Sequence, residues 1–457
     1  MKLQTGTCVL LLSLLALPAF AQSEPNLEAQ VDAYVKPYVE TGNFSGAILI
    51  ARQGKVLFSK GYGMANREWA IPNTPETRFQ IASVSKPFTA AAIFMLQQQG
   101  KLSIQDPLSK FVPDYPQGDL ITLDHLLSHT SGVPNVNQFP EYDEKARSPL
   151  TLTQVVALFK DKPLDFQPGE KYSYSNSNYN LLAFVIEKVS GMEYGEFLRR
   201  NIFTPLGMND TGQPLAGQIL LRRASGYVPV GMTDVEASPY LDWSIKTGNG
   251  SLYSTVEDLY KFDRALYGDG ILGAASRGKS FSEHAGVGYG WSLRKNRLGR
   301  TSVGITGRSP GFSSSLERFL ADDVCIVMLS NLYSSLTANL AEDLAAFAFG
   351  EKPPAPALLA PASVSPQVVD ALVGQYQLGE DFSFQPNLKV VITRKGEFLL
   401  MEMGQVQSYL IPQSDTVFVD RVYGGKVTFV RDEAGTVTHL LWNFGRDYQA
   451  SRIATSR

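Results

Sequence analysis

Hydrophobic and polar residues alternate in two separate parts of the chain, with a long stretch of helical pattern between them. Residues 43–63 contain two alternating apolar runs, 46–51 and 56–58, separated by Gln53-Gly54. A turn between two such runs predicts a β-hairpin. Strand-like patterns return at 288–294, 302–305, 314–319 and 324–329.

Apolar residues recur with helical spacing between these two parts. The clearest segment, 88–96, is followed by Gly100, and glycine often ends helices because it adopts the left-handed conformation at little cost. Helical patterns are expected at 88–96, 153–159, 181–189, 255–267 and 338–348. Sheet segments at both ends with helices between them predict an α/β (α+β) domain. It would have one antiparallel sheet flanked by helices and an all-helical insert.

The composition changes after this domain. Residues 351–367 are rich in Pro and Ala, which predicts a semi-rigid linker. Short β-patterned runs separated by Gly, Pro or Asp then follow at 388–393, 398–401, 416–419, 426–431 and 437–442. Their even spacing predicts a small antiparallel β-barrel. We therefore expect a first domain at 22–350 and a barrel domain at 368–457.

The first 21 residues have the features of a secretion signal. Lys2 gives a positive start, residues 8–17 form a short apolar core, and Ala19-Phe20-Ala21 fits a small-x-small cleavage site. The apolar core is too short to span a bilayer, and no later segment approaches the roughly 18 apolar residues that a span needs. We expect an exported bacterial protein, periplasmic or secreted, without stable membrane insertion after cleavage.

The composition limits the classes of molecule that the protein is expected to bind. The chain has 457 residues, of which 44% are hydrophobic, and its net charge is −3 without a basic cluster. Hydrophobic content of this kind suits globular cores, and the charge predicts no nucleic-acid partner. His125 and His129 lie four apart, as metal ligands sometimes do, but Leu126 breaks the H-E-x-x-H pattern. We expect no metal and no other cofactor.

One predicted helical turn carries the candidate chemistry. Ser83-Val84-Ser85-Lys86 stands at the head of the 88–96 segment, and residues three apart on a helix share a face. A desolvated lysine can take the proton that makes a serine hydroxyl nucleophilic. Lowering a lysine pKa from ~10.4 to roughly 7–8 takes about 4 kcal/mol of burial and neighbouring charge.

Two later motifs fit the same chemistry. Tyr174-Ser175-Asn176 places a hydroxyl near an amide that can both donate and accept. Residues 304–314, Gly-Ile-Thr-Gly-Arg-Ser-Pro-Gly-Phe-Ser-Ser, form the second of these motifs. A serine–lysine enzyme needs a nucleophile with its base, a proton relay with an amide, and an edge strand beside the substrate. These parts occur here in that order.

With these motifs the sequence resembles the serine beta-lactamase and penicillin-binding-protein superfamily, in its class C-like branch of esterases, DD-peptidases and D-aminopeptidases. The resemblance covers most of residues 28–350. It is also carried by the stretches 79–82, 102–108, 121–132, 250–255, 288–291 and 327–331. The predicted barrel is similar to the lipocalin-like appendage that some of these hydrolases carry, and shaping substrate access would be one role for it.

The resemblance implies acyl transfer in two steps. Ser83 would attack the substrate carbonyl while Lys86 and Tyr174 handle the proton. Tyr174 would protonate the leaving group and later activate water. The oxyanion hole would use the backbone N–H groups of Ser83 and Arg308. The substrate and oxyanion positions are Asn176, Thr306, Gly307 and Arg308.

The third motif departs from the family pattern. Ile305-Thr306-Gly307 stands where Lys-Thr-Gly or His-x-Gly is usual. The missing cation weakens recognition of a carboxylate, which beta-lactams and D-Ala-D-Ala termini both carry, and Arg308 could replace it in part. A literal Lys246-Thr247-Gly248 occurs earlier, but it resembles a loop that enters a helix rather than an edge strand.

Rival nucleophiles fit less well. Residues 307–311 spell G-x-S-x-G around Ser309, but that elbow needs an N–H from the following residue, and Pro310 has none. Cys325 has no histidine nearby in sequence. We expect a serine hydrolase that acts through acyl-Ser83 on a small-molecule ester or on D-amino-acid-containing peptides or amides. The alternatives are a true class C-like enzyme with a beta-lactam substrate and a catalytically weak binding protein for cell-wall peptides.

Overall fold

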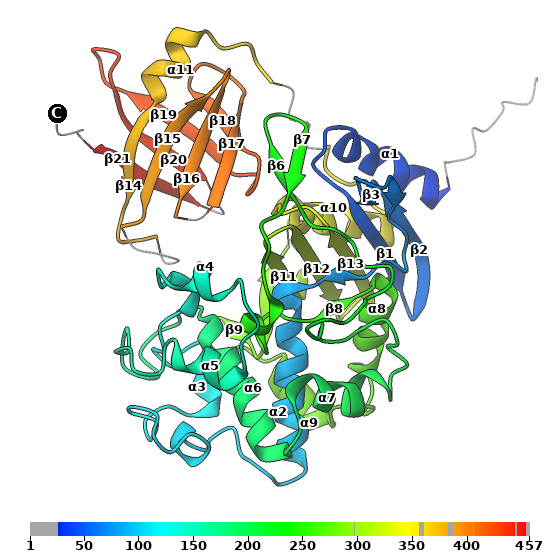
Figure 1. The fold of residues 1–457 in the computed structure, drawn as a ribbon. Helices are drawn as coiled ribbons and strands as arrows, with labels where there is room; N and C mark the ends of the chain where they lie inside the picture. The colour runs from blue at the N-terminus through cyan, green and yellow to red at the C-terminus, as the bar shows by residue number, and fades with distance from the viewer. Residues whose placement is uncertain are drawn as a thin grey trace, which may run out of the picture.

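The computed structural model describes residues 26–296, 298–355, 361–382, 387–404, 406–443 and 446–453. Figure 1 shows a domain of mixed helix and sheet and, at its upper left, a barrel formed by the C-terminal strands. The predicted signal peptide, residues 1–21, lies outside the described residues. None of the described helices combines the length and apolar character that crossing a membrane requires.

The predicted antiparallel sheet is present, with seven strands in the order β2-β1-β13-β12-β11-β10-β9. Strands from the two ends of the domain meet in its centre, where Gly46 pairs with Ser330 and Arg52 with Val324. The sheet strands are β1 (Gly46–Arg52), β2 (Lys55–Tyr62), β9 (Val287–Gly288), β10 (Trp291–Lys295), β11 (Thr301–Ser309), β12 (Phe312–Phe319) and β13 (Val324–Ser330). The hairpin and the later strand patterns therefore belong to one sheet.

Helices cover both faces of this sheet (Figure 1). Alternate residues of a strand face opposite sides, so Leu49 joins the apolar cluster beneath α2 and α8, while Ile48 joins the cluster beneath α1 and α10. Phe88 of α2 stacks on Phe262 of α8 at 3.9 Å. The covering helices are α1 (Leu27–Glu40), α2 (Lys86–Gln98), α8 (Val256–Ala265) and α10 (Leu336–Phe349). Gly100 follows α2 with a φ of 68°, as its expected role at the helix end requires.

The segment between β2 and β9 contains the helical insert and three small two-stranded sheets. Besides α2 and α8, the helices of this segment are η1 (Ala82–Ser85), η2 (Leu108–Lys110), α3 (Leu123–Leu127), η3 (Val136–Gln138), α4 (Tyr142–Lys145), α5 (Leu152–Ala157), α6 (Asn176–Ser190), α7 (Tyr194–Leu198), η4 (Arg199–Phe203), η5 (Trp243–Lys246) and α9 (Ala274–Ser280). The small sheets pair β3 (Met64–Asn66) with β4 (Ile71–Pro72), β5 (Phe79–Gln80) with β8 (Tyr253–Ser254), and β6 (Tyr227–Val230) with β7 (Asp234–Ala237).

The C-terminal part forms a closed eight-stranded antiparallel barrel. Its strands are β14 (Gly374–Leu378), β15 (Lys389–Lys395), β16 (Phe398–Met403), β17 (Val406–Pro412), β18 (Val417–Asp420), β19 (Lys426–Arg431), β20 (Val437–Asn443) and β21 (Asp447–Ile453). The barrel is closed by β14 and β21, where Tyr376 pairs with Arg452. A short helix, α11 (Pro366–Leu372), precedes the first strand and starts within the stretch predicted as a linker.

Residues 420–425, from the last residue of β18 to the start of β19, contact the first domain, and we call them the docking loop; β17 of the barrel also contacts β6. Arg421 of this loop is 0% exposed. Its guanidinium donates to the carbonyls of Val230, Gly231 (3.1 Å) and Asp234 (2.8 Å) in the β6–β7 hairpin. It also donates to the Gly42 carbonyl at 3.1 Å and to Asn43 Oδ1 at 3.2 Å. One buried arginine thus joins the barrel to two segments of the first domain.

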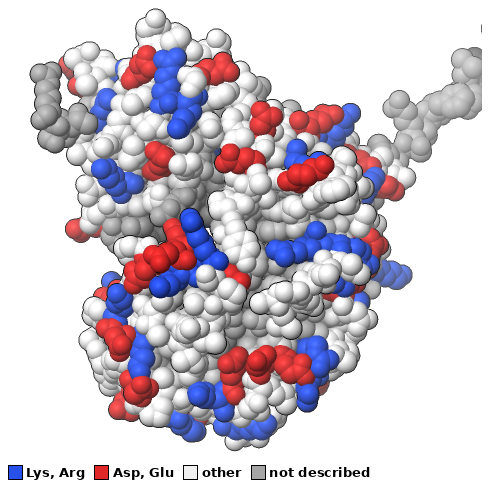
Figure 2. Space-filling view, in the orientation of Figure 1, with Lys and Arg blue, Asp and Glu red and all other residues white. Residues whose placement is uncertain are grey.

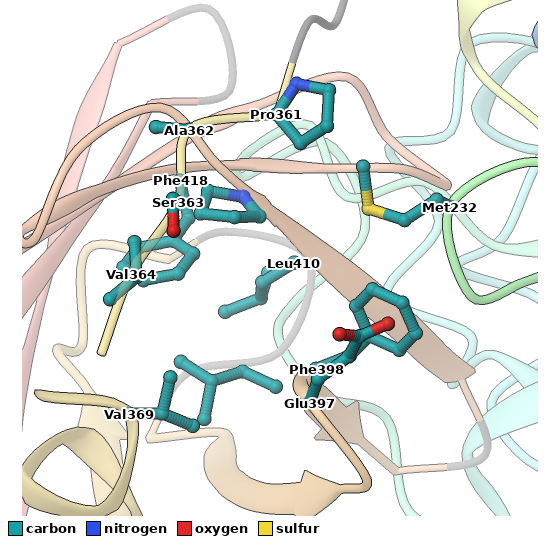
Figure 3. Close-up of a pocket in the computed structure, with 12 residues that line it drawn as sticks. Met232, Pro361, Ala362, Ser363, Val364, Val369, Glu397, Phe398, Leu410 and Phe418 are labelled. Carbon is teal, nitrogen blue, oxygen red and sulfur yellow. The ribbon is translucent and has the colours of Figure 1, made fainter. Parts of the chain in front are cut away.

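A hollow of ≈ 340 Å³ lies at the same junction. Figure 3 shows Met232, at the tip of the β6–β7 hairpin, facing Phe398 and Leu410 of the barrel across it. None of the predicted catalytic residues lines this hollow. On the face of the molecule in Figure 2, basic and acidic residues are interspersed.

Candidate active site

Ser83 and Lys86 lie on one side of a tight helical turn. Ser83 belongs to η1, and α2 begins at Lys86. A 3₁₀-helix has three residues per turn, so side chains at positions i and i+3 lie above one another. Lys86 Nζ donates to Ser83 Oγ at 3.1 Å. Ala82, just before the serine, has a φ of 45°, a conformation that costs a non-glycine residue about 1–3 kcal/mol.

Tyr174 and Asn176 reach the same pair of side chains from the helical insert. Tyr174 lies in the segment before α6, and Asn176 is the first residue of that helix. The Tyr174 hydroxyl shares a hydrogen bond of 2.8 Å with Ser83 Oγ. Lys86 Nζ donates to Asn176 Oδ1 at 2.9 Å and to the Asn249 carbonyl at 2.8 Å. The four residues predicted from separate motifs therefore form one hydrogen-bonded cluster.

The electrostatics of this cluster favour neutral side chains. Burial, and secondly the positive charge of Lys246, hold the pKa of the Lys86 ammonium well below its usual 10.5. Burial raises the pKa of the Tyr174 hydroxyl, against the opposing effect of its hydrogen bond with Ser83. Burial also lowers the pKa of His129, whose ring lies 4.6 Å from the Tyr174 ring, to about 3. The lowered pKa of Lys86 favours its neutral amine, which can accept a proton, and the raised pKa of Tyr174 favours its protonated hydroxyl.

The predicted edge strand lies beside the serine. In the described part of the chain, β10 pairs with β11 from Thr301 to Gly304, so the edge at 305–309 has no strand partner on that side. A two-residue turn joins Ser309 to Phe312, which makes these two a hydrogen-bonded pair. Along two antiparallel strands, hydrogen-bonded residue pairs alternate with pairs that are not hydrogen-bonded, so Arg308 and its partner Ser313 form a pair of the second kind. The backbone N–H of Arg308 therefore points away from β12, toward the open edge.

Gly307 brings this edge close to Ser83. A Cβ at position 307 would lie 2.9 Å from the Ser83 backbone nitrogen and 2.4 Å from the Ile81 carbonyl oxygen. Any larger residue would push the strand away from η1. Ser314 on β12 donates to the same Ile81 carbonyl at 2.7 Å and so holds η1 against the sheet.

Side chains on this strand face alternate sides. Ile305 lies on the same side as Gly307, toward η1, and is 8% exposed. Thr306 and Arg308 lie on the other side. The Arg308 guanidinium lies 4.2 Å from the centre of the Tyr423 ring in the docking loop. The side chain of Arg308 is thus turned toward the barrel, and its backbone N–H remains at the open edge.

The structure adds residues that the motifs did not identify. Asn137 Oδ1 accepts from Asn176 Nδ2 at 2.7 Å, and Asn249 supplies the carbonyl that holds Lys86. His129 packs on Tyr174 and accepts from the Ser175 backbone N–H at 3.2 Å. Lys246, which the sequence predicted to lie in a loop, ends the short helix η5 and is not on a strand. Its positive charge lowers the pKa of Lys86. In the sequence, the only feature that drew attention to Lys246 was the literal Lys246-Thr247-Gly248.

The side chains of the alternative metal-binding and nucleophile hypotheses do not form a site. His125 Nδ1 accepts from the Thr122 backbone N–H at 3.3 Å, so it caps its own helix apart from His129. Within the described residues, no group of three or more His, Cys, Asp or Glu side chains is arranged to hold a metal ion. The Cys325 thiol is buried in β13, and burial raises its pKa. Ser309 is buried too, at 1% exposure.

Comparison with known proteins agrees with this fold and this site. Residues 31–351 match the family model "Beta-lactamase". Penicillin-binding protein 4* of Bacillus subtilis is 30% identical over 445 residues, which cover 90% of this chain and 96% of the relative.

Two solved structures share the fold. The octameric penicillin-binding protein homologue from Pyrococcus abyssi covers 93% of this chain and 100% of its own, at 24% identity and a TM-score of 0.63. The D-amino acid amidase from Ochrobactrum anthropi SV3 covers 71% of this chain and 99% of its own, at 23% identity and a TM-score of 0.65. The chain therefore belongs to the beta-lactamase family, and it is an enzyme of the serine hydrolase class.

Proposed function

We propose that the protein hydrolyses esters or D-amino-acid-containing amides and peptides through a covalent acyl-Ser83 intermediate. The observation that carries this proposal is the double contact of Ser83 Oγ, with Lys86 Nζ at 3.1 Å and the Tyr174 hydroxyl at 2.8 Å. The serine is partly exposed, so a carbonyl carbon can reach it. A nucleophile that is hydrogen-bonded to both a base and a second hydroxyl is the arrangement that acyl transfer needs.

In the acylation step, Ser83 Oγ bonds to the substrate carbonyl carbon while its proton passes to neutral Lys86. The lowered pKa of Lys86 suits this role, because a base works best when its pKa lies near the operating pH. Tyr174 gives its proton to the leaving oxygen or nitrogen as the bond to the carbonyl carbon breaks. Lys86 then returns a proton to Tyr174, so that the net transfer runs from serine to leaving group.

Deacylation reverses this order with water as the nucleophile. Water attacks the acyl carbon, its proton passes to the Tyr174–Lys86 pair, and Ser83 leaves with a proton restored. In both steps the negative charge on the carbonyl oxygen would be stabilised by the backbone N–H groups of Ser83 and Arg308. Gly307 supports this by its close approach to the Ser83 nitrogen. One such donor is worth about 3–4 kcal/mol.

Hydrolysis of p-nitrophenyl butyrate by the purified protein tests the proposal. Ser83→Ala should abolish turnover and also labelling by a fluorophosphonate probe, with the mass shift located on Ser83 in the wild type. Ser309→Ala is the matched control, because this buried serine has no hydrogen-bond partner among the described residues. Absence of turnover and labelling, with a panel of esters and D-amino acid amides, would contradict the proposal and favour a binding protein.

The substrate class follows from Ile305. This side chain gives the nucleophile-facing side of the strand no cation, so an anionic beta-lactam loses one charge-assisted hydrogen bond, worth about 1.5–3 kcal/mol. We expect esters to be hydrolysed well above beta-lactams, and Ile305→Lys or Ile305→His to shift the ratio toward the anionic substrate. Faster wild-type hydrolysis of a cephalosporin than of p-nitrophenyl butyrate, at matched concentrations, would overturn this and indicate a true beta-lactamase.

We also propose that the protein is exported. Lys2, the apolar core at 8–17 and the Ala19-Phe20-Ala21 site support cleavage after Ala21. Mass spectrometry of the protein from periplasmic and culture fractions should find a mature N-terminus at Gln22. A full-length chain retained in the cytoplasmic fraction would contradict export.

A further inference from the structure

Lys246 lies one tight turn from the candidate base. Its backbone carbonyl accepts from the N–H groups of Asn249 at 3.0 Å and Gly250 at 2.8 Å. The Asn249 carbonyl in turn accepts from Lys86 Nζ at 2.8 Å. The two lysines are therefore connected through one short loop, and the charge of Lys246 reaches the Lys86 ammonium.

Among the described residues, the Lys246 ammonium has no partner of opposite charge. Lys246 is 8% exposed, and its nitrogen takes part in no ion pair and no hydrogen bond with those residues. Its contact is the Tyr142 ring, whose centre lies 5.9 Å away. The buried Arg318, in contrast, pairs with Asp263 at 2.5 Å. Most of the Lys246 side chain is buried while its nitrogen stays within reach of solvent, so an anion that enters the site can pair with it.

The position of Lys246 indicates which part of a substrate would carry that anion. Lys246 is on the side of the nucleophile where Asn249 and Asn176 hold Lys86, whereas β11 lies against Ser83 at Gly307. The strand itself offers Ile305 in place of a cation. An anionic group of the substrate would thus be recognised near Asn176, one of the predicted substrate positions, and not at the strand edge.

We propose that Lys246 binds a carboxylate on the acyl part of the substrate, and that it sets the preference of the enzyme for anionic acyl groups. This inference rests on the proposed function of Ser83 as an acyl acceptor. It names a substrate class, esters or amides of acids with a second carboxylate. Lys246 would act as a specificity-determining residue rather than in the acyl transfer itself.

Two matched probes test this: mono-p-nitrophenyl adipate, which is anionic, and its methyl ester, which has the same acyl chain without the charge. The full chain should prefer the anionic probe in kcat/KM, mainly through KM, by about ten- to a hundredfold, the value of a charge-assisted hydrogen bond. Lys246→Met should remove that preference, and Lys246→Arg should keep most of it. Lys171→Met, an exposed lysine three residues before Tyr174, should leave the ratio unchanged.

The outcomes separate the two proposals. Turnover of both probes without a preference in the wild type overturns the role of Lys246 but leaves Ser83 as the nucleophile. An equal loss on both probes in Lys246→Met also overturns it, since that pattern would reflect only the effect of the charge on Lys86. If neither probe is hydrolysed and Ser83 is not labelled, the proposed function itself fails. The wild-type ratio decides the matter even where a variant does not fold.

Discussion

Lys86 in the hydrogen-bonded cluster around Ser83 and Arg421 in the docking loop are both buried basic side chains, with exposed fractions of 1% and 0%. Both are also held by neutral oxygen atoms. Lys86 donates to a hydroxyl, a side-chain amide and a backbone carbonyl. Arg421 donates to four backbone carbonyls and a side-chain amide. The same physical situation serves two different ends.

The two side chains differ in whether burial lowers their pKa enough for them to lose a proton. Burial brings the pKa of Lys86 well below 10.5, so this side chain can give up its proton and become a base. Burial lowers the pKa of Arg421 only to about 10, so its guanidinium stays charged at neutral pH. A permanent buried charge needs all of its hydrogen bonds, and Arg421 therefore fixes the barrel to the first domain.

Replacing Lys86 with arginine, the residue type of the docking loop, gives the largest expected effect. Lys86→Arg places a permanent cation near Ser83 and removes an amine that can be neutral. We expect kcat/KM for p-nitrophenyl butyrate to fall by about 10³-fold, the usual contribution of a general base. Thermal unfolding of the variant serves as the control for folding. Retention of activity within tenfold of the wild type would show that Lys86 does not act as the base.

Arg421→Ala tests the other side of the comparison. It leaves buried carbonyls at Gly42 and in the β6–β7 hairpin without donors, so the free energy of unfolding should fall by about 3 kcal/mol. Urea unfolding of the full chain measures this change. Arg431→Ala is the matched control, because this barrel arginine donates to the Gly435 carbonyl at the exposed surface. Equal effects of the two substitutions would contradict a docking role for Arg421.

The sequence predicted the contacts that depend on short-range spacing. Ser83 and Lys86 meet because they are three residues apart on a helical turn, and Tyr174 and Asn176 come from one motif. Asn249 and Lys246 could not be predicted in this way. They reach Lys86 only because the loop at 246–250 folds against α2, and no local pattern encodes that approach.

The barrel shows the same limit. The predicted runs at 388–393, 398–401, 416–419, 426–431 and 437–442 correspond to β15, β16, β18, β19 and β20. In β14 only Tyr376 and Leu378 are buried apolar residues, too few for a clear alternation. This strand pairs with the next strand, β15, and also with the end of the chain, where Tyr376 is opposite Arg452, and the second pairing is not local.

The charge of Lys246 provides a smaller test of the Lys86 side. If neutral Lys86 is the base as proposed, kcat/KM should fall as pH decreases through the pKa of Lys86. Lys246→Met removes a like charge, which lets that pKa rise. The acid limb of the kcat/KM profile for p-nitrophenyl butyrate should therefore move to higher pH, while in Lys246→Arg it should stay close to its wild-type position. An unmoved limb in Lys246→Met would show that the two amines are not coupled.

Tyr423 links the two regions and should give the smallest effect. Its ring lies 4.2 Å from the guanidinium carbon of Arg308, whose backbone N–H is the proposed oxyanion donor. An aromatic ring over a guanidinium contributes about 0.5–2 kcal/mol. If the docking loop positions this strand residue, Tyr423→Ala should lower kcat for a neutral ester about three- to tenfold with little change in KM. Tyr423→Phe retains the ring and should recover most of the rate. A variant that loses stability but keeps the wild-type kcat would mean that the barrel only packs against the catalytic domain.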